Sequence, residues 1–318
     1  MFKLPEAWVW DFWLVDDGSR YHLFFLYASR AVLDPDERHR RAAVGHAVSH
    51  DLSSWERVAD ALVHSNPPAF DDLAIWTGSV TQHPDGRWFM FYTGGSRGPD
   101  DTVAQTIGYA TSRDLITWTK APGPVLVADP QWYEKHGAGH WHEEAFRDPW
   151  VLPDPAGHGW HMLITARANN GADHDPVDRG VVGHAWSADL ETWELRKPLS
   201  EPGQGFGHLE VFQVAEIDGR HVLVFNCLAQ DMADARRATG TTGGVWVAAA
   251  ETALGPFDIA NAQQLTDDRL YVGKFIRDRE TGLTRFLAFI NTVNGHFVGE
   301  IADPMAVAWQ GDSLVISR

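Results

Sequence analysis

One segment occurs three times along the chain, and this repeat constrains the fold more than any other feature of the sequence. The copies share the core S-x-D-L-x-x-W and lie at 44–58, 107–121 and 182–196. Each copy is typical of an alternating strand, a tight turn opened by Asp, and a second strand begun by Trp. We interpret three aspartates as structural turn residues whose carboxylates accept hydrogen bonds from nearby backbone N–H groups: Asp51, Asp114 and Asp189.

Five units of this kind cover the chain. A short apolar strand precedes each copy, and two more strand pairs without the motif follow at 221–260 and 284–310. Every pair is preceded by another short segment bounded by turn residues. The third strands start at 44, 107, 182, 245 and 298, which is too irregular for a solenoid and too widely spaced for a WD40-type array. The pattern predicts an all-β fold, a five-bladed β-propeller that forms a single domain over 1–318.

The composition favours a small neutral molecule as the partner. A net charge of −17 disfavours nucleic acid and anionic membranes, because the average field of the protein repels both. No stretch approaches the roughly 20 apolar residues of a membrane span. The first ten residues, MFKLPEAWVW, lack the apolar core and cleavage site of a secretory signal, which predicts a cytoplasmic protein. The single cysteine, Cys227, excludes an intrachain disulfide, and nothing in the sequence indicates the oligomeric state.

Three acidic residues lie at similar places in the first strands of blades one, three and four. Asp11, Asp148 and Glu210 precede the second strand of their blades by ten to twelve residues, among apolar or aromatic neighbours. The matching places in blades two and five fall near 77–78 and 273–274. One such acid could be a satisfied structural carboxylate. Three of them would converge on the central funnel of a propeller, so we predict a shared pocket.

Clustered carboxylates point to acid and base chemistry. Like charges that crowd a funnel raise the pKa of at least one member, as catalysis near neutral pH requires. Cleavage of a glycosidic bond needs one carboxylate as nucleophile or base and one carboxylic acid to protonate the leaving oxygen. The fifteen tryptophans suit the stacking of sugar rings, although they suit packing in a β core equally well.

Four strings resemble the ordered motifs of the β-fructosidase superfamily, glycoside hydrolase families 32 and 68. They are VWDFW (9–13), WTGS (76–79), FRDP (146–149) and LEVFQV (209–214). The resemblance covers nearly the whole chain and implies a five-bladed propeller. The first string is more similar to the levansucrase-type form of its motif than to the invertase-type form.

The resemblance implies a role for each acid. Asp11 would be the nucleophile, Glu210 the general acid and base, and Asp148 the stabiliser of the transition state, with Arg147 orienting the sugar. Four residues would line the fructosyl subsite, although the aromatic ones fit core packing as well: Trp10, Trp13, Trp76 and Thr77. His208, two residues before Glu210, would share its strand face and lie at the substrate, or be structural.

The resemblance also implies the reaction. We expect a retaining hydrolase that acts on β-fructofuranosides such as sucrose, fructo-oligosaccharides or fructans, with transfer of the fructosyl group as a further outcome. The chain departs from the invertase-type motif, since Val211 and Phe212 follow Glu210 in place of Cys and Pro. The fifth predicted blade reaches the end of the sequence, so we expect no carboxyl-terminal β-sandwich of the kind usual in family 32. Two alternatives stay open: an inverting arabinofuranosidase or xylosidase similar to family 43, and a non-catalytic propeller that binds glycans.

A cluster of histidines and acids before FRDP is a second candidate site. The segment HGAGHWHEE contains His136, His140, His142, Glu143 and Glu144. The spacing matches no familiar metal signature, so we interpret the cluster as a polar loop at the rim of the pocket. We therefore expect no metal and no cofactor.

Overall fold

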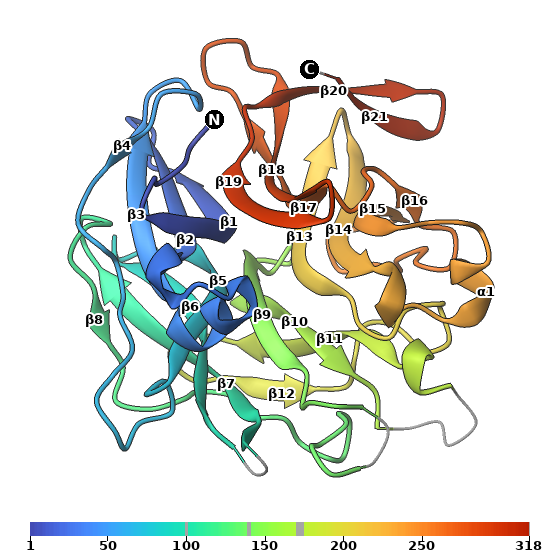
Figure 1. Ribbon diagram of the computed structural model, residues 1–318, viewed down its shortest axis with the longest axis horizontal. Helices are drawn as coiled ribbons and strands as arrows, with labels where there is room; N and C mark the ends of the chain where they lie inside the picture. The colour runs from blue at the N-terminus through green and yellow to red at the C-terminus, as the bar shows by residue number, and fades with distance from the viewer. Residues whose placement is uncertain (99–100, 139–140, 170–174, 318) are drawn as a thin grey trace.

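The computed structural model describes residues 1–98, 101–138, 141–169 and 175–317. Five antiparallel sheets follow one another along the chain and surround a common centre, which confirms the predicted five-bladed β-propeller (Figure 1). The innermost strands all border this centre, and they are β1 (Ala7–Asp16), β5 (Ala74–Gln82), β9 (Phe146–Pro153), β13 (Glu210–Ile217) and β17 (Leu270–Arg277). No helix among these residues is long and apolar enough to cross a membrane.

The middle strands of each blade are buried and apolar. The second strands are β2 (Tyr21–Ser29), β6 (Trp88–Arg97), β10 (Trp160–Arg167), β14 (Arg220–Leu228) and β18 (Thr284–Val293). The third strands of blades one to four are β3 (Ala43–Ser49), β7 (Val103–Ser112), β11 (Gly180–Ser187) and β15 (Gly243–Ala250). Side chains from facing blades form apolar clusters between the sheets, and Cys227 lies buried in one of them. This packing holds the blades in a ring.

The outermost strands of the first four blades are short. They are β4 (Glu56–Arg57), β8 (Thr119–Lys120), β12 (Glu194–Arg196) and β16 (Gln263–Gln264). The turns before β4, β8 and β12 lie in the three sequence repeats. Their hydrogen bonds confirm that the repeated aspartates are structural turn residues. Asp51 Oδ1 accepts hydrogen bonds from the N–H groups of Ser53 (2.8 Å) and Ser54 (2.7 Å), and Asp114 and Asp189 repeat this pattern.

Blade five departs from the expected strand order. The segment predicted as its third strand is divided into β19 (His296–Ile301) and β20 (Met305–Gln310), which both pair with β18. Pro304 lies at the break and has no N–H group for a ladder. The last strand is β21 (Ser313–Ser317). Phe2 and Ile301 exchange two backbone hydrogen bonds of 2.9 Å, so the start of the chain joins blade five and closes the ring.

Helices are few and lie in the connections. Those that lie wholly within the described residues are η1 (Arg30–Val32), η2 (Pro35–Arg41), η4 (Pro176–Asp178), η5 (Ala229–Asp231) and the four-residue α1 (Asp234–Arg237). Both η5 and α1 lie in the connection between β14 and β15. Of these elements, η2 and η5 contribute side chains to the centre of the ring.

Candidate active site

Every innermost strand contains a β-bulge, and the candidate residues lie at these bulges. The register with the second strand breaks between Trp10 and Phe12, Trp76 and Gly78, Arg147 and Trp150, Glu210 and Gln213, and Tyr271 and Lys274. The backbone takes a positive φ at Asp148 (56°), Val211 (55°) and Val272 (51°). Residues other than glycine rarely adopt a positive φ, and this backbone conformation persists only where the surrounding structure enforces it. A bulge re-aims side chains, here toward the centre of the ring.

Alignment of the blades at their bulges defines two equivalent positions. The first bulge residue is Asp11, Thr77, Asp148, Val211 or Val272. The residue before it is Trp10, Trp76, Arg147, Glu210 or Tyr271. The prediction that three acids share one position is therefore right for Asp11 and Asp148 and wrong by one residue for Glu210. The number of residues between each acid and the second strand of its blade does not reveal this offset. That number depends on the length of the intervening turn as well as on the bulge.

Each of three bulges is held by a side chain from the preceding blade. Thr93 Oγ1 accepts a hydrogen bond from the N–H of Asp148 (2.9 Å), and Thr165 Oγ1 accepts one from Val211 (3.2 Å). Asn226 Oδ1 accepts one from Gly273 (3.2 Å). These acceptors lie on β6, β10 and β14, directly opposite the residue that precedes the bulge in their own blades. The neighbouring blade thus enforces the strained backbone at the centre.

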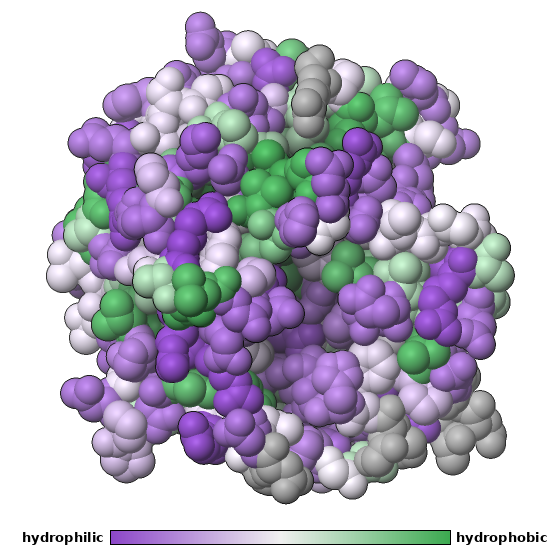
Figure 2. Space-filling model, in the orientation of Figure 1, coloured by the Kyte–Doolittle hydropathy of each residue, from purple (hydrophilic) through white to green (hydrophobic). Residues whose placement is uncertain are grey.

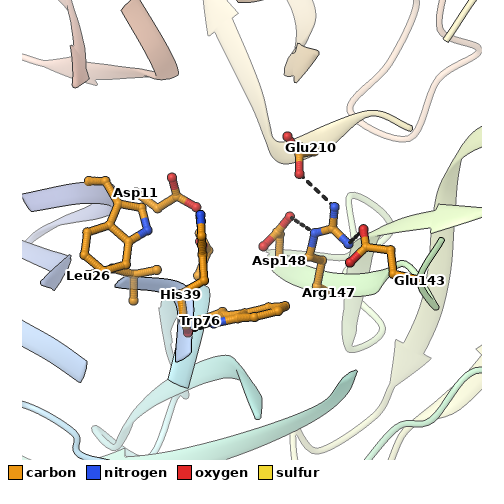
Figure 3. Close-up of a pocket in the computed structure, with 10 residues that line it drawn as sticks. Asp11, Leu26, His39, Trp76, Glu143, Arg147, Asp148 and Glu210 are labelled. Carbon is orange, nitrogen blue, oxygen red and sulfur yellow. Dashed lines mark hydrogen bonds and ion pairs between the residues drawn. The ribbon is translucent and has the colours of Figure 1, made fainter. Parts of the chain in front are cut away.

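The side chains at the bulges converge on one pocket of about 220 Å³. Figure 2 shows a recess with hydrophilic walls near the middle of the face, and Figure 3 shows the carboxylates entering the pocket from different blades. The pocket is lined by Trp10, Asp11, Leu26, His39, Trp76, Thr77, Glu143, Arg147, Asp148 and Glu210. Seven of the nine residues proposed from the sequence are therefore together here.

The other two proposed residues, Trp13 and His208, lie elsewhere. Trp13 is fully buried in the core, where its ring stacks on Phe24 with centroids 6.2 Å apart. It does not line the pocket, because the extra residue at Asp11 breaks the alternation of the strand. His208 lines an adjoining space of about 470 Å³, together with Tyr271 and Asp231.

Arg147 links the carboxylates of two blades and a loop. Its Nη1 donates to Glu143 Oε1 (2.8 Å) and its Nη2 donates to Glu210 Oε1 (2.8 Å), while Nε lies 3.6 Å from Asp148 Oδ2 (Figure 3). Burial disfavours the guanidinium, but the charges of Glu143 and Glu210 outweigh it and raise the pKa of Arg147 well above its usual value. The arginine is therefore a permanent charge that draws three acids together.

The two aspartates at the bulges bind protons more strongly than usual. Burial raises the pKa of Asp11 to about 6, although Thr77 Oγ1 donates a hydrogen bond of 2.5 Å to its Oδ2 and so opposes the shift. Burial also raises the pKa of Asp148 to about 7, against the charge of Arg147 and a hydrogen bond of 2.9 Å from Thr165. Both groups thus titrate near neutral pH.

Glu210 behaves in the opposite way. Burial acts to raise its pKa, but His208, Arg147 and a hydrogen bond of 2.5 Å from the Tyr271 hydroxyl prevail and lower it to about 2. His208 Nε2 lies 3.7 Å from both Glu210 Oε2 and Asp231 Oδ2. The site therefore sets the pKa values of its acids apart, which is the condition for different roles in acid and base catalysis.

Sequence reasoning did not single out Tyr271, and it read Glu143 only as part of a rim loop. Tyr271 occupies the same bulge position as Arg147 and Glu210, so an alignment at the bulges would have found it. Glu143 also accepts a hydrogen bond of 2.9 Å from Gln105 Nε2, and Glu144 pairs with Lys135 at 2.6 Å. His140 lies outside the described residues. Within the described part of this loop, the two carboxylates engage protein cations, and no group of three metal ligands occurs.

Comparison with known proteins defines the class. The chain matches the family model "Glycosyl hydrolases family 32 N-terminal domain" over residues 12–293. The fold and the site already place the chain among the five-bladed propellers with an acidic central pocket. The chain belongs to glycosyl hydrolase family 32, of which it contains the N-terminal domain.

Similar proteins include plant enzymes of carbohydrate metabolism. The chain is 33% identical over 155 residues to "Acid beta-fructofuranosidase 4, vacuolar" of Arabidopsis thaliana, which is 47% of this chain and 20% of the relative. It is 35% identical over 156 residues to "Fructan 1-exohydrolase" of Aegilops tauschii, or 47% of this chain and 23% of that protein. The matched segments thus span about a fifth to a quarter of these relatives.

The fold agrees with a solved structure of an inulosucrase. The structure titled "Inulosucrase from Halalkalicoccus jeotgali bound to kestose" superposes with a TM-score of 0.80 over 98% of this chain and 87% of that chain, at 23% identity. At this level of identity the similarity supports the propeller fold.

Proposed function

We propose that the protein is a retaining glycoside hydrolase or fructosyltransferase that acts on β-fructofuranosides. The observation that carries this proposal is the convergence of Asp11, Asp148 and Glu210 on one pocket, with Arg147 between the last two. Membership of family 32 supports it. The relatives named as a fructofuranosidase and a fructan exohydrolase support a furanoside of fructose as the substrate.

In the first half of the proposed reaction, the Asp11 carboxylate attacks the anomeric carbon of the fructosyl unit. The bond from that carbon to the leaving oxygen breaks, and the leaving oxygen takes a proton from Glu210. Thr77 donates to Asp11 Oδ2 and holds the carboxylate in place. Asp148 binds sugar hydroxyls, while Trp10 and Trp76 border the ring.

In the second half, water or a sugar hydroxyl attacks the fructosyl ester of Asp11. Glu210 takes the proton of the attacking group and Asp11 leaves as a carboxylate. The ionised Glu210 seen beside Arg147 and Tyr271 suits this half. For the first half Glu210 needs a proton, so we propose that Arg147 turns from Glu210 to the sugar hydroxyls and thereby raises the pKa of Glu210.

The test is a panel of substrates. Wild-type protein and the Asp11→Asn variant are incubated with sucrose, inulin, levan and aryl arabinofuranosides, and released sugars are followed by NMR. We expect fructose from at least one fructoside with the wild type and none with the variant. Release of arabinose alone would instead identify an enzyme similar to family 43, and no release from any sugar would support a glycan-binding propeller.

Location and further sites stay predictions. The cytoplasmic location predicted from the first ten residues is tested by fractionation of the native cells, because one relative is named as a vacuolar protein. A role for His208 in binding the leaving or accepting sugar is supported by its place in the adjoining space next to Glu210. A His208→Ala variant with a raised KM for the substrate would agree with that role.

A further inference from the structure

An arginine behind the pocket joins three loops. Arg167 is the last residue of β10, and its side chain is only 1% exposed. Its Nε donates a hydrogen bond of 3.0 Å to Glu134 Oε2, and its Nη2 donates one of 2.6 Å to the carbonyl oxygen of Pro176. Its Nη1 donates to the carbonyl oxygen of Gly207. The three partners lie in the loops before β9, β11 and β13, so one side chain holds these loops together.

The place of Arg167 in its strand carries a charge in blade three alone. It lies two residues after the residue that pairs with the one before the bulge. The equivalent residues of the other blades are Ala28, Gly95, Leu228 and Asn291. A buried ion pair contributes little net stability, because both charges lose their hydration. Packing of the blades therefore does not explain why blade three has an arginine here.

Arg167 contacts both sides of the segment that contains His208. Its guanidinium carbon lies 4.0 Å from the centre of the Trp141 ring, which is a cation–π contact. The Trp141 ring in turn meets the His208 ring edge to face, with centroids 5.9 Å apart. Gly207 lies so close to Trp141 that an added Cβ would be 2.9 Å from the indole ring. Arg167 thus holds His208 through the indole ring and through the carbonyl group of the preceding residue.

His208 presents a hydrogen-bond donor next to Glu210. Its Nδ1 lies 3.4 Å from Arg147 Nη2, and because a guanidinium only donates, the proton of the neutral ring lies on Nε2. This Nε2 is 3.7 Å from both Glu210 Oε2 and Asp231 Oδ2. It makes no hydrogen bond within the part of the chain that the structure describes. The N–H group is therefore available to a hydroxyl group in the adjoining space that His208 lines.

We propose that Arg167 is a positioning residue that holds His208 so that its Nε2–H binds a hydroxyl group of the leaving or accepting sugar. The inference rests on the proposed function, which gives His208 this contact. Without Arg167, the Trp141 ring and the Gly207 carbonyl lose their common partner, and the His208 ring is free to turn. A misplaced donor weakens binding of the substrate and of the transition state alike, so KM should rise while kcat changes little.

The test is a mutant cycle between Arg167 and His208. Arg167→Met is combined with Glu134→Gln, because the arginine is the paired cation of this buried carboxylate. Arg87→Met with Glu191→Gln removes a surface ion pair of 2.8 Å and is the matched control. Thermal unfolding and circular dichroism establish that each variant is folded. If the paired Arg167 variant does not fold, Arg167→Lys replaces it, because lysine keeps the charge but lacks the planar fork that contacts the ring and the carbonyl groups together.

The first readout is KM for the cleaved fructoside. We expect it to rise about tenfold in His208→Ala and about fivefold in the paired Arg167 variant, with kcat within about twofold in both and no change in the control. The variant that combines all three substitutions should equal His208→Ala alone, because Arg167 acts through His208. A combined rise of about fiftyfold, the product of the two effects, would overturn the proposal. An unchanged KM in His208→Ala or in the paired Arg167 variant would overturn it as well.

The second readout is the NMR signal of His208, which needs no substrate. Protein with ¹³C-labelled histidine rings is compared between variants, and the His208 signal is assigned by its loss in His208→Ala. We expect this signal to shift in the paired Arg167 variant and to keep its wild-type position in the control. A signal that does not move in the Arg167 variant would contradict the positioning role. If the wild-type protein cleaves no sugar, the proposed function fails, and the NMR comparison still decides whether Arg167 holds His208.

Discussion

In blade one, Asp51 lies in an exposed outer turn and Asp11 lies in the pocket at the centre of the ring. Backbone N–H groups of Ser54 and Ser53 donate to Asp51 and lower its pKa to about 2. Burial raises the pKa of Asp11 to about 6. Folding therefore favours the charged form of the outer carboxylate and disfavours that of the inner one.

The same contrast extends to the other blades. Three outer turns share one geometry, in which the leucine after Asp takes a positive φ and accepts a hydrogen bond from the tryptophan indole; they contain Leu52, Leu115 and Leu190. The inner bulges share no such motif, and their first residue is Asp in two blades, Thr in one and Val in two. The repeated turns stabilise the fold. The bulges hold strained and charged groups in one pocket, which the fold tolerates because the rest of the structure is stable.

The largest expected effect is on activity. Asp11→Asn removes the proposed nucleophile and should lower kcat/KM for the cleaved fructoside on the order of 10⁴-fold. Asp51→Asn changes only an outer turn and should leave kcat/KM within about twofold. Steady-state assays of the two folded variants measure this difference, and an active Asp11→Asn protein would contradict the role of Asp11.

The next effect is on stability and concerns two arginines. Arg147→Met leaves buried carboxylates without their cation, so we expect the free energy of unfolding to fall by about 3–5 kcal/mol. Arg57 makes surface ion pairs with Glu6 and Asp60, and Arg57→Met should cost less than about 1 kcal/mol. Urea denaturation of both variants tests the comparison, and equal losses would mean that the central charges are not coupled.

A smaller effect should appear in the pH dependence of activity. The attack requires ionised Asp11, and its pKa is raised to about 6. On the acidic side, kcat, which reports the enzyme–substrate complex in which Glu210 has regained its proton, should therefore fall about tenfold per unit below pH 6. The acidic midpoint in Asp51→Asn should be unchanged. A midpoint near 4 would show that Asp11 has an ordinary pKa.

The smallest effects are opposite shifts in stability at pH 7.5. The raised pKa of Asp11 means that its contribution to stability is present below about pH 4 and lost as the pH rises through 6, so Asp11→Asn should stabilise the protein by about 1–2 kcal/mol. The lowered pKa of Asp51 means that its contribution is present above about pH 4 and lost toward pH 2. Asp51→Asn should destabilise by about 1 kcal/mol or less, since the turn is exposed. Thermal unfolding at pH 7.5 and pH 4 measures both, and shifts of the same sign would contradict the contrast.

The sequence reveals the outer turns better than the inner bulges. The turns depend on local contacts between Asp51 and the residues that directly follow it, so a short motif predicts them. The division of the last blade at Pro304 and the place of Glu210 one residue before its bulge depend on strand register. Trp13 was wrongly expected in the subsite for the same reason. Tyr271 contacts Glu210 and Glu143 contacts Gln105, each on another blade, and no single segment of sequence contains such pairs.

The central claim is that Asp11 and Glu210 form a nucleophile and acid pair on β-fructofuranosides. The most direct test is to run the reaction in the presence of methanol and to determine the configuration of the methyl fructofuranoside by NMR, because this product does not interconvert as free fructose does. A covalent fructosyl ester on Asp11 predicts the methyl β-anomer. The methyl α-anomer as the first product would show a single displacement and contradict the assignment.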